Sequence, residues 1–360
     1  MKKIVIYFNS MSPAGGIERV IANLANNWIE NFEVTILTKD NKLSFYKLDN
    51  SIKTDDLNVN SKMDMSNRIK RIFSVFFNMF LVAYKLKSYF KHNEVDYIYI
   101  ATPMNAFEIY LASHKLLRKS VVAEHASYFG YNRVYNIIKK FIYPKARIIA
   151  TPTTMDHKIY IKKGYNSVYI PHLSTFPAVR NNSSQRIALS VGRLTADKRQ
   201  LDLLKIWKNF KVVDENNWKL IIVGQGELEN ELIKFIKLNQ LNDSVKLISP
   251  TSDVEEIYKQ ASLFLFSSKY EGFGMVLLEA MSFGLPCISY DIPSGPKDIV
   301  KNGQNGFLIA NNDCTEFVKK ISLLTSDKKL LNAMKEEAYQ TANSWDNPFI
   351  LSLWYDKVFI

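Results

Sequence analysis

Short runs of apolar and β-branched residues alternate along the chain with longer amphipathic stretches. The apolar runs are continuous rather than alternating, which is typical of strands covered by helices on both faces. Helical stretches between such strands predict βαβ units and parallel sheets. The predicted strands span residues 4–8, 34–37, 97–101, 121–124, 148–151 and 168–171, and then 187–191, 220–223, 245–248, 263–267, 286–290 and 306–309.

A polar segment without periodicity, HLSTFPAVRNNSSQ at residues 172–185, separates the two series of strands. At 360 residues the chain is too long for one ordinary core and suits two domains. We therefore expect an α/β protein with two doubly wound, Rossmann-like domains at residues 1–172 and 186–340. Such sheets bind ligands at the carboxyl ends of their strands, so the site is expected in a cleft between two facing domains.

The composition is that of an ordered globular protein, but its charge is uneven. The formal charge is +12; residues 1–150 contain 22 Lys/Arg and 12 Asp/Glu, or +10, and the remaining residues contain 25 and 23, or +2. This asymmetry predicts an anionic surface as a partner of the first domain. Cys287 and Cys314 form neither a metal-binding pattern nor a disulfide framework, which favours a reducing cytoplasm.

Segment 67–92 is the most apolar basic stretch, yet no stretch reaches the roughly 18 apolar residues of a membrane span. The run at 4–8 is likewise too short for a signal peptide and predicts a first strand. An amphipathic helix with basic ends can lie on an anionic membrane. The alternative is that its phenylalanines pack on the first sheet. The bases are Arg68, Lys70, Arg71, Lys85, Lys87 and Lys91, around Phe73, Phe76, Phe77, Phe80 and Leu81.

Two glycine-containing loops follow predicted strands. Gly15-Gly16 precedes a helix and can bring bare backbone N–H groups close to a phosphate, although an ordinary strand-to-helix turn gives the same pattern. VGQGELEN carries Glu229 where the dinucleotide fingerprint has its third glycine, which removes the main support for hydride transfer. A tight turn is the simpler interpretation of that loop.

Basic side chains and a histidine also stand at strand ends. Arg193 and Lys198 follow the strand at 187–191, where a guanidinium fork and an ammonium suit a phosphate; two solvated loop residues would look the same. His125 ends the strand at 121–124, a position that lines the site in such sheets. A lone histidine is, however, more often a structural hydrogen-bonding group.

Two carboxylates stand in YEGFGMVLLEAMSFGLPCISYD, residues 270–291. Glu271 precedes a Gly-Phe-Gly turn and Glu279 lies within an apolar run. Burying a charge without a partner costs several kcal/mol, so these groups either face water or hold a ligand. No Asp-x-Asp metal motif is present; the nearest pattern is Asp253-x-Glu255 in a helical stretch, and no metal is expected.

Together these motifs resemble glycosyltransferase family 4, the retaining, metal-independent transferases of the GT-B fold, and within it the enzymes of bacterial O-antigen and capsular polysaccharides. The resemblance covers nearly the whole chain in order. Arg199 departs from it, because many members have glycine after the lysine. The matching segments are the Gly15-Gly16 loop, Ala123-Glu124-His125, Gly192-Arg193 with Lys198, EGFGMVLLEAMSFGLPCI with its Glu-x7-Glu spacing, and SGPKDIVKNGQNGFLI.

The resemblance implies a role for each candidate residue. Glu271 would contact the transferred sugar, Glu279 the ribose of the nucleotide, and His125 the donor sugar. Stabilisation of the leaving diphosphate would fall to Arg193, Lys198 and the Gly15-Gly16 amides. No general base is assigned, because the diphosphate itself would help to deprotonate the acceptor. The implied catalytic residues are Arg193, Lys198, Glu271 and His125, and the implied donor-binding residues are Gly15, Gly16, Arg193, Lys198, Gly272, Phe273, Gly274 and Glu279.

The implied reaction moves a hexose or N-acetylhexosamine from a nucleotide-sugar to a glycan acceptor on a lipid, for surface polysaccharide. UDP-linked donors are the first choice and GDP-mannose the second, with no cofactor. The first domain would bind the acceptor, and the enzyme would be cytoplasmic and peripheral on the inner face of the plasma membrane. The aromatic segment at 341–360 would pack back on the first domain; a helix on the second domain's own core is the alternative.

Three other functions compete with the transferase. A nucleotide-sugar epimerase shares the fold but should lack the Glu-x7-Glu spacing. A non-catalytic partner subunit would not need intact Glu271, Glu279, Arg193 and Lys198. The basic charge also suggests a nucleic-acid binder, but no nucleic-acid-binding motif is present, so no nucleic-acid partner is expected.

Overall fold

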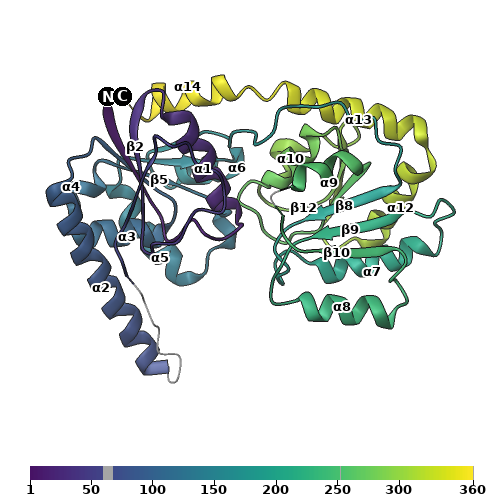
Figure 1. Ribbon diagram of the computed structural model, residues 1–360, viewed down its shortest axis with the longest axis horizontal. Helices are drawn as coiled ribbons and strands as arrows, with labels where there is room; N and C mark the ends of the chain where they lie inside the picture. Colours follow the sequence, from purple (N-terminus) through teal and green to yellow (C-terminus); the bar gives the residue numbers. More distant parts are fainter. Residues whose placement is uncertain (60–67, 252, 360) are drawn as a thin grey trace. The chain divides into compact units, whose positions relative to one another are not determined.

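The computed structural model describes residues 1–59, 68–251 and 253–359, without the side chains of residues 68–73, 75 and 76. The chain divides into two compact units (Figure 1). Unit 1 comprises Met1–Leu173 and Pro348–Ile360, and unit 2 comprises Ser174–Asn347. The chain thus passes from unit 1 to unit 2 inside the polar segment at 172–185.

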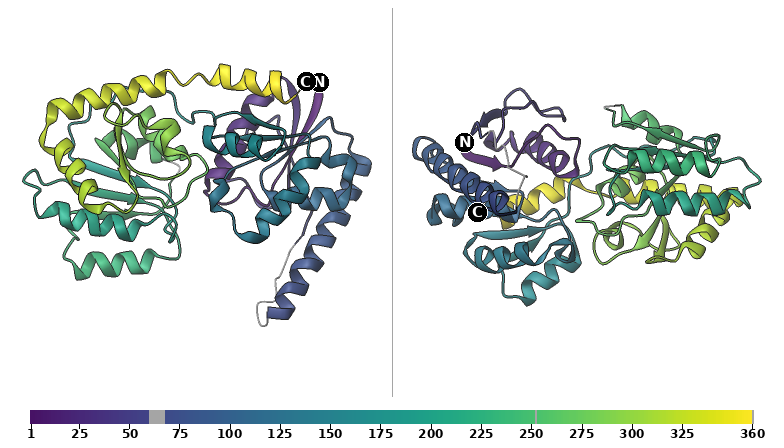
Figure 2. Two further views of the ribbon diagram at one scale, coloured as in Figure 1. Left: turned by 180° about the vertical axis from the view of Figure 1, so that it is seen from behind. Right: turned by 90° about the horizontal axis from the view of Figure 1, so that it is seen from below.

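Unit 1 contains a parallel sheet in the order β3-β2-β1-β4-β5-β6-β7. Its strands are β1 (Lys2–Tyr7), β2 (Phe32–Thr38), β3 (Lys53–Asp56), β4 (Tyr97–Ile100), β5 (Ser120–Ala123), β6 (Ile148–Thr151) and β7 (Ser167–Tyr169). Helices cover both faces (Figure 2). They are α1 (Gly16–Trp28), α2 (Arg68–His92), α3 (Pro103–Ala112), α4 (His114–Leu117), α5 (Arg133–Ile142), α6 (Thr154–Lys162) and α14 (Asn347–Lys357), with 3-10 turns η1 (Tyr128–Gly130) and η2 (Tyr143–Lys145).

Unit 2 contains a second parallel sheet in the order β10-β9-β8-β11-β12-β13. Its strands are β8 (Ile187–Val191), β9 (Lys219–Val223), β10 (Val245–Ile248), β11 (Leu263–Phe266), β12 (Cys287–Asp291) and β13 (Gly306–Ala310). The helices are α7 (Gln200–Lys211), α8 (Glu229–Leu238), α9 (Val254–Gln260), α10 (Met275–Ser282), α11 (Pro296–Ile299), α12 (Cys314–Ser326) and α13 (Lys328–Asn343).

The two parallel α/β sheets confirm the predicted fold class, and every predicted strand overlaps an observed one. The strands are continuous apolar runs because both faces are covered; β4, β5, β6 and β11 are buried at every position. Only β3 was missed among the described strands. Its sequence is KTDD and all four residues are exposed, so this edge strand has no apolar signal.

The C-terminal helix α14 belongs to unit 1, where Figure 1 shows it in yellow. Trp354 lies 5.4 Å from Trp28 between ring centroids, and Phe359 lies 5.2 Å from Trp28. The Tyr97 hydroxyl donates to the backbone carbonyl of Phe359 over 2.8 Å. Residues 341–347, by contrast, stay with unit 2, so the segment that joins unit 1 is shorter than the expected 341–360.

Helix α2 buries one side and exposes the other. Met79, Val82 and Leu86 are buried, whereas Phe77 and Phe80 are 70% and 60% exposed. The alternative in which these two phenylalanines pack on the first sheet is therefore wrong; the side chains of Phe73 and Phe76 lie outside the described residues. None of the helices in the described part of the chain is long and apolar enough to cross a membrane.

Candidate active site

An ion pair joins two loops at the carboxyl edge of the unit 2 sheet. Lys198 follows β8, Glu271 follows β11, and these strands are neighbours. The ammonium of Lys198 donates to Oε1 of Glu271, and the two side chains are 19% and 12% exposed. Ser268 donates to the same oxygen over 2.8 Å, and the Ser267 hydroxyl donates to the backbone carbonyl of Lys198 over the same distance. The lysine and the carboxylate are thus held in place before any ligand arrives.

Arg193 lies in the same loop as Lys198 but is exposed. Its guanidinium makes no ion pair with any residue that the structure describes. Its backbone carbonyl accepts from the amide of Gln200 over 2.7 Å, which anchors the loop and leaves the side chain to solvent. Arg199 adopts a left-handed conformation, with φ 54°, at the N-cap of α7. Glycine occupies this conformation without strain, which explains in physical terms why many family members have glycine at this position.

The glycines of VGQGELEN are explained by packing. A Cβ on Gly224 would lie 2.0 Å from the carbonyl oxygen of Gly192, and one on Gly226 would lie 2.3 Å from that of Leu194. The Leu194 amide donates to the carbonyl of Gln225 over 2.9 Å. The loops after β8 and β9 therefore meet backbone to backbone, as expected for a tight turn.

Glu279 lies in α10 with only 2% of its surface exposed. The Tyr258 hydroxyl donates to Oε2 over 3.1 Å, and the Thr175 hydroxyl donates to Oε1 over 3.4 Å. Hydroxyl donors of the protein thus stabilise this carboxylate inside an apolar helix. Neutral hydroxyls are the same type of donor that a ribose presents.

The loop before α10 approaches the loop after β12. Gly274, at φ 89°, is the N-cap of α10, and Gly295, at φ 98°, would place a Cβ 2.6 Å from the carbonyl oxygen of Phe273. Phe273 is 2% exposed, and its ring packs on Trp345. Ser294 donates to the carbonyl of Gly272 over 3.4 Å.

In unit 1, Gly15 is the N-cap of α1 and Gly16 its first residue. The Glu18 carboxylate turns back onto Gly15, because a Cβ built there would lie 2.1 Å from its Oε2. A carboxylate in the first turn is stabilised by the helix dipole. The place where a phosphate would approach these amides is thus partly taken by a side chain of the protein, which a ligand would have to displace.

His125 follows β5 and lies half-buried between two partners. Its Nε2 is 2.9 Å from the Tyr99 hydroxyl, and its ring stacks on His172 at 5.3 Å between centroids and 17° between planes. Burial lowers the pKa of His125 to about 4, although the neighbouring Glu124 opposes the shift. Burial, with His125 nearby, also lowers the pKa of His172 well below its ordinary value. Both rings are therefore neutral at pH 7.

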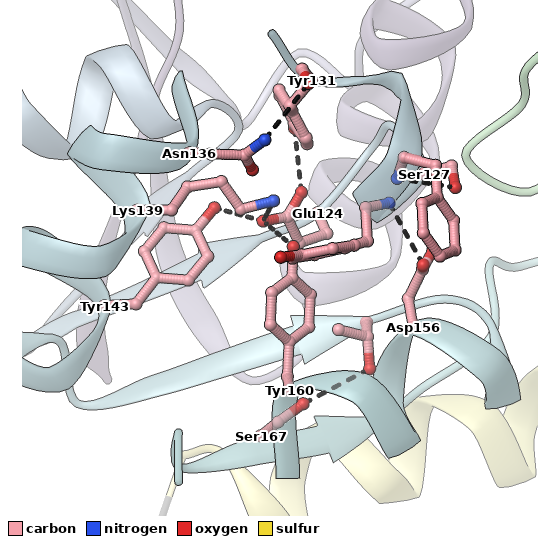
Figure 3. Close-up of polar contacts among 12 residues, drawn as sticks. Glu124, Ser127, Tyr131, Asn136, Lys139, Tyr143, Asp156, Tyr160 and Ser167 are labelled. Carbon is pink, nitrogen blue, oxygen red and sulfur yellow. Dashed lines mark hydrogen bonds and ion pairs between the residues drawn. The ribbon is translucent and has the colours of Figure 1, made fainter. Parts of the chain in front are cut away.

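Glu124, one residue before His125, lies in a buried polar cluster (Figure 3). Its side chain is 0% exposed and forms an ion pair with Lys139, itself 3% exposed, over 3.0 Å. The hydroxyls of Tyr131 and Tyr160 donate to the carboxylate over 2.8 and 2.9 Å, and that of Tyr143 donates to it as well.

A second network lies at the carboxyl ends of β1 and β2. Glu108 is 4% exposed, accepts from the Tyr7 hydroxyl over 2.8 Å and pairs with Lys39 over 2.6 Å. The amide of Asn105 donates to Glu108 over 3.1 Å and to Asn9 over 3.0 Å. These donors fix the charge of Glu108 at the sheet edge.

The structure brings Lys198 and Glu271 into contact, but it does not group them with Glu279, whose partners are Tyr258 and Thr175. The Asp253-x-Glu255 pattern begins α9, where Glu255 pairs with Lys259 over 2.9 Å. Within the described ranges, no three His, Cys, Asp or Glu side chains gather as a metal-binding group.

Two family models match the chain one after the other. "Glycosyltransferase Family 4" matches residues 14–172, and "Glycosyl transferases group 1" matches residues 174–341. The chain belongs to glycosyltransferase family 4. The boundary between the two matches coincides with the change from unit 1 to unit 2. The glycosyltransferase activity expected from the motifs is thereby confirmed.

Relatives of this glycosyltransferase span its full length. The amylovoran biosynthesis glycosyltransferase AmsD of Erwinia amylovora is 28% identical, with 99% of each chain covered. A Campylobacter jejuni N-acetylgalactosaminyltransferase that acts on an undecaprenol-linked acceptor is 24% identical over 95% of this chain and 94% of its own. Among solved structures, Staphylococcus aureus TarM superposes with a TM-score of 0.83 at 16% identity over 99% of both chains, which supports the GT-B fold.

Sequence reasoning missed several residues of this glycosyltransferase's candidate site. His172 and Tyr258 lie far along the chain from the motifs they touch, so no local spacing identifies them. Glu18 stands three residues after Gly15, and an acidic residue in the first turn of a helix was the available signal for it. Lys139 sits in a helix whose other bases are exposed, and nothing local marks it as the buried one. A charged residue on the apolar side of a helical repeat is the one available signal.

We predict that the His125 imidazole stays neutral at pH 5 in a nitrogen-15 NMR titration, with its signals assigned by their loss in His125→Gln. Between pH 6.5 and 4 an unfolded histidine binds a proton that native His125 does not. The unfolded state then holds more protons, so the free energy of unfolding falls as the pH drops through this window. His125 contributes on the order of 2 kcal/mol to this fall in the free energy of unfolding. A midpoint near pH 6.5 would contradict this environment.

Proposed function

We propose that the chain transfers a hexose or N-acetylhexosamine from a nucleotide-sugar, UDP-linked as the first choice, to a lipid-linked glycan, in the synthesis of a surface polysaccharide. The transfer retains the α configuration and needs no metal. Unit 2 binds the donor and unit 1 the acceptor. The names of the relatives are those of transferases, which disfavours an epimerase or a non-catalytic subunit.

The observation that carries the proposal is the Lys198–Glu271 pair at the carboxyl edge of unit 2. Cleavage of a glycosidic bond builds positive charge on the anomeric carbon and negative charge on the leaving diphosphate. A fixed carboxylate and a fixed ammonium side by side are complementary to both charges. Exposed Arg193 adds a guanidinium fork that suits a diphosphate.

The donor and acceptor classes rest on what related proteins are known to bind. TarM was solved with UDP, and the HepE protein of Anabaena with UDP and glucose, although at 16% and 18% identity these share the fold alone. The Campylobacter relative acts on an undecaprenol-linked glycan. A uridine diphosphate donor and a polyprenol-linked acceptor are therefore the first pair to test.

The remaining assignments follow the same proposal. Glu279 holds the ribose by exchanging a protein hydroxyl for a ribose hydroxyl, and the main chain at Gly272, Phe273 and Gly274 lines the donor site. Neutral His125 donates a hydrogen bond to the donor sugar. Gly15 and Gly16 offer amides to the diphosphate once Glu18 moves aside.

Arg193→Ala and Lys198→Ala should each reduce kcat by on the order of a hundredfold or more, because each removes one preorganised donor to the leaving group. The matched controls are Arg186→Ala, at the opposite end of β8, and Lys269→Ala, in the Glu271 loop; both residues are exposed. Transfer of radiolabelled sugar to an undecaprenyl diphosphate-linked glycan measures the effect. Unchanged kcat in both site variants, or equal losses in the controls, would remove this site.

Transfer should persist in excess EDTA, because the cations of Arg193 and Lys198 supply the charge that a divalent ion would otherwise bring to the diphosphate. The same radiolabel assay measures it, with a metal-dependent transferase as the positive control for chelation. Loss of activity that Mg²⁺ or Mn²⁺ restores would show that a metal takes part.

A lipid-linked acceptor requires unit 1 to meet a membrane, and two of its helices expose apolar side chains beside bases. On α2, Phe77, Phe80 and Tyr84 are 70%, 60% and 72% exposed, and Lys87 and Lys91 continue the same face. Spacings of three and four residues put these positions on one side of the helix. An amphipathic helix of this kind lies in the interface of an anionic leaflet.

Helix α5 repeats the pattern. Val134, Ile137 and Phe141 are 60%, 62% and 48% exposed, and Arg133 and Lys140 are exposed beside them. Both α2 and α5 pack on α3. The chain has no acidic residue from 68 to 92, and from 97 to 155 its only ones, Glu108 and Glu124, are buried. Glu94 and Asp96 lie between these two stretches and are exposed, but the helices α2 and α5 themselves carry bases and no acids. This positive charge supports a peripheral position on the cytoplasmic face of the plasma membrane.

We predict that the protein pellets with phosphatidylglycerol vesicles at low salt and is largely released at high salt, because each base near an anionic surface contributes about 1 kcal/mol that salt screens. Lys87→Gln/Lys91→Gln should weaken pelleting; Lys85 is left out because it donates to the carbonyls of Leu57 and Asn58. The apolar triples Phe77→Ser/Phe80→Ser/Tyr84→Ser and Val134→Ser/Ile137→Ser/Phe141→Ser should each reduce the salt-resistant remainder.

The matched control for the apolar triples is Val212→Ser/Val213→Ser/Leu238→Ser, three residues of unit 2 that are 83%, 57% and 73% exposed. It should pellet like the wild type. Equal binding to neutral and anionic vesicles, or none to either, would refute the electrostatic part of the membrane contact while leaving the transfer reaction untouched.

A further inference from the structure

The Glu124–Lys139 pair is a costly feature that the proposed reaction does not use directly. Both charges are out of water, at 0% and 3% exposure. An apolar pair of similar volume at such a place is often as stable or more stable. A contribution to stability therefore does not explain why this buried pair is present. Its directional contacts suggest that it holds neighbouring parts of the chain in place.

The carboxylate of Glu124 is held from several sides, as Figure 3 shows. Its Oε1 accepts from Tyr143 and from Tyr160 over 2.9 Å and forms the ion pair with Lys139 over 3.0 Å, and its Oε2 accepts from Tyr131 over 2.8 Å. These partners come from α5, α6, the turn η2 and the segment just before α5. A group fixed by donors from separate elements has one position, because any movement breaks a charge-assisted bond.

The ammonium of Lys139 lies among aromatic rings. It is 3.8 Å from the ring centroid of Tyr131 and 4.8 Å from that of Tyr160, with Tyr143 and Tyr128 at 5.4 and 5.5 Å. Ring faces stabilise a desolvated cation. Glu124 is the one carboxylate paired with this lysine among the described residues.

The cluster closes the segment that carries His125. Glu124 begins this segment and Tyr131 ends it, and the two side chains are hydrogen-bonded to each other. Both also contact Lys139, Glu124 through the ion pair and Tyr131 through its ring. In between, the amide of Tyr128 donates over 3.1 Å to Asp156, which is 1% exposed. His125 follows Glu124 directly in the chain, but its ring lies outside the cluster and contacts Tyr99 and His172.

We propose that Lys139 is a positioning residue for sugar transfer: by closing the buried pair with Glu124 inside its cage of tyrosines, it sets the course of residues 124–131 and so the place of His125. This inference rests on the proposed contact of His125 with the donor sugar. Lys139 touches no reacting group. It holds the side chain of Glu124, and Glu124 is joined through the main chain to His125.

The test compares Lys139→Met, which removes the charge and keeps the volume, with Lys140→Met, the same change at the exposed neighbouring residue of α5. Lys139→Met should lower kcat roughly ten- to hundredfold, as expected of a small displacement of a contact group. Its KM for the nucleotide-sugar should change little, because the unit 2 loops are unaltered. The ring nitrogen-15 signals of His125 should move in Lys139→Met and stay in Lys140→Met.

Lys139→Met strands a buried carboxylate and could fail to fold, so Glu124→Gln/Lys139→Met provides the second variant. It removes both charges, and the glutamine amide still offers one acceptor to the tyrosines. We expect it to fold, with moved His125 signals and a reduced kcat. The single amide oxygen of the glutamine cannot accept all the hydrogen bonds that the two carboxylate oxygens of Glu124 accept. Wild-type kcat and unmoved His125 signals in either folded variant would overturn the proposal.

A double-mutant cycle with His125→Ala distinguishes a positioning role of Lys139 from a general loosening of the fold. If Lys139 acts through His125, Lys139→Met should lower kcat little further in the His125→Ala background, whereas a structural defect would lower it again. A wild-type enzyme that transfers no sugar would refute the proposed function itself. Normal kcat in His125→Ala would refute the contact of His125 with the donor sugar, and with it this role of Lys139, while the proposed transferase function would stand.

Discussion

A carboxylate taken out of water must be met by donors, and this requirement shapes both sheet edges of the protein. Glu124, Glu271 and Glu279 each lie at or just beyond a strand end, or in the helix that follows one, and each is met by a lysine or by hydroxyls. Glu108 is met by Lys39, Tyr7 and Asn105. Because these bonds are directional, the carboxylates also fix the loops that carry them.

The donors differ in kind, and so does what each carboxylate can do. Glu271 is 12% exposed and paired with a lysine that is itself accessible, so a ligand can meet both charges. Glu279 is deeply buried and bonded to neutral hydroxyls, which a ligand hydroxyl could replace. Glu124 is fully enclosed and meets no solvent, so its influence must pass through the chain. Burial thus separates groups that act on a ligand from one that holds other groups in place.

In unit 1, the carboxyl edge of the sheet and the outer faces of helices α2 and α5 carry different kinds of side chains. The carboxyl edge of its sheet gathers neutral polar groups such as buried Tyr99 and Asn105 and half-buried His125. The helices α2 and α5 present exposed apolar side chains and bases, and neither helix contains an acidic residue. Helix α5 belongs to both descriptions, because its outer face carries Ile137 and its inner face carries Lys139. The helix that we expect to meet lipid is therefore bonded to the strand end that holds His125.

The sequence by itself determined the fold class, because continuous apolar runs and amphipathic helices have periods that can be counted along the chain. It also indicated which loops carry charge at strand ends, including Arg193, Lys198 and Glu271. Edge strand β3 was not predicted, because its exposed sequence KTDD has no periodic apolar residues. Only the tertiary structure decided which charges pair, which glycines serve packing, and that Phe77 and Phe80 are exposed while Lys139 is buried. Those outcomes depend on contacts between residues distant in the chain, which no local pattern encodes.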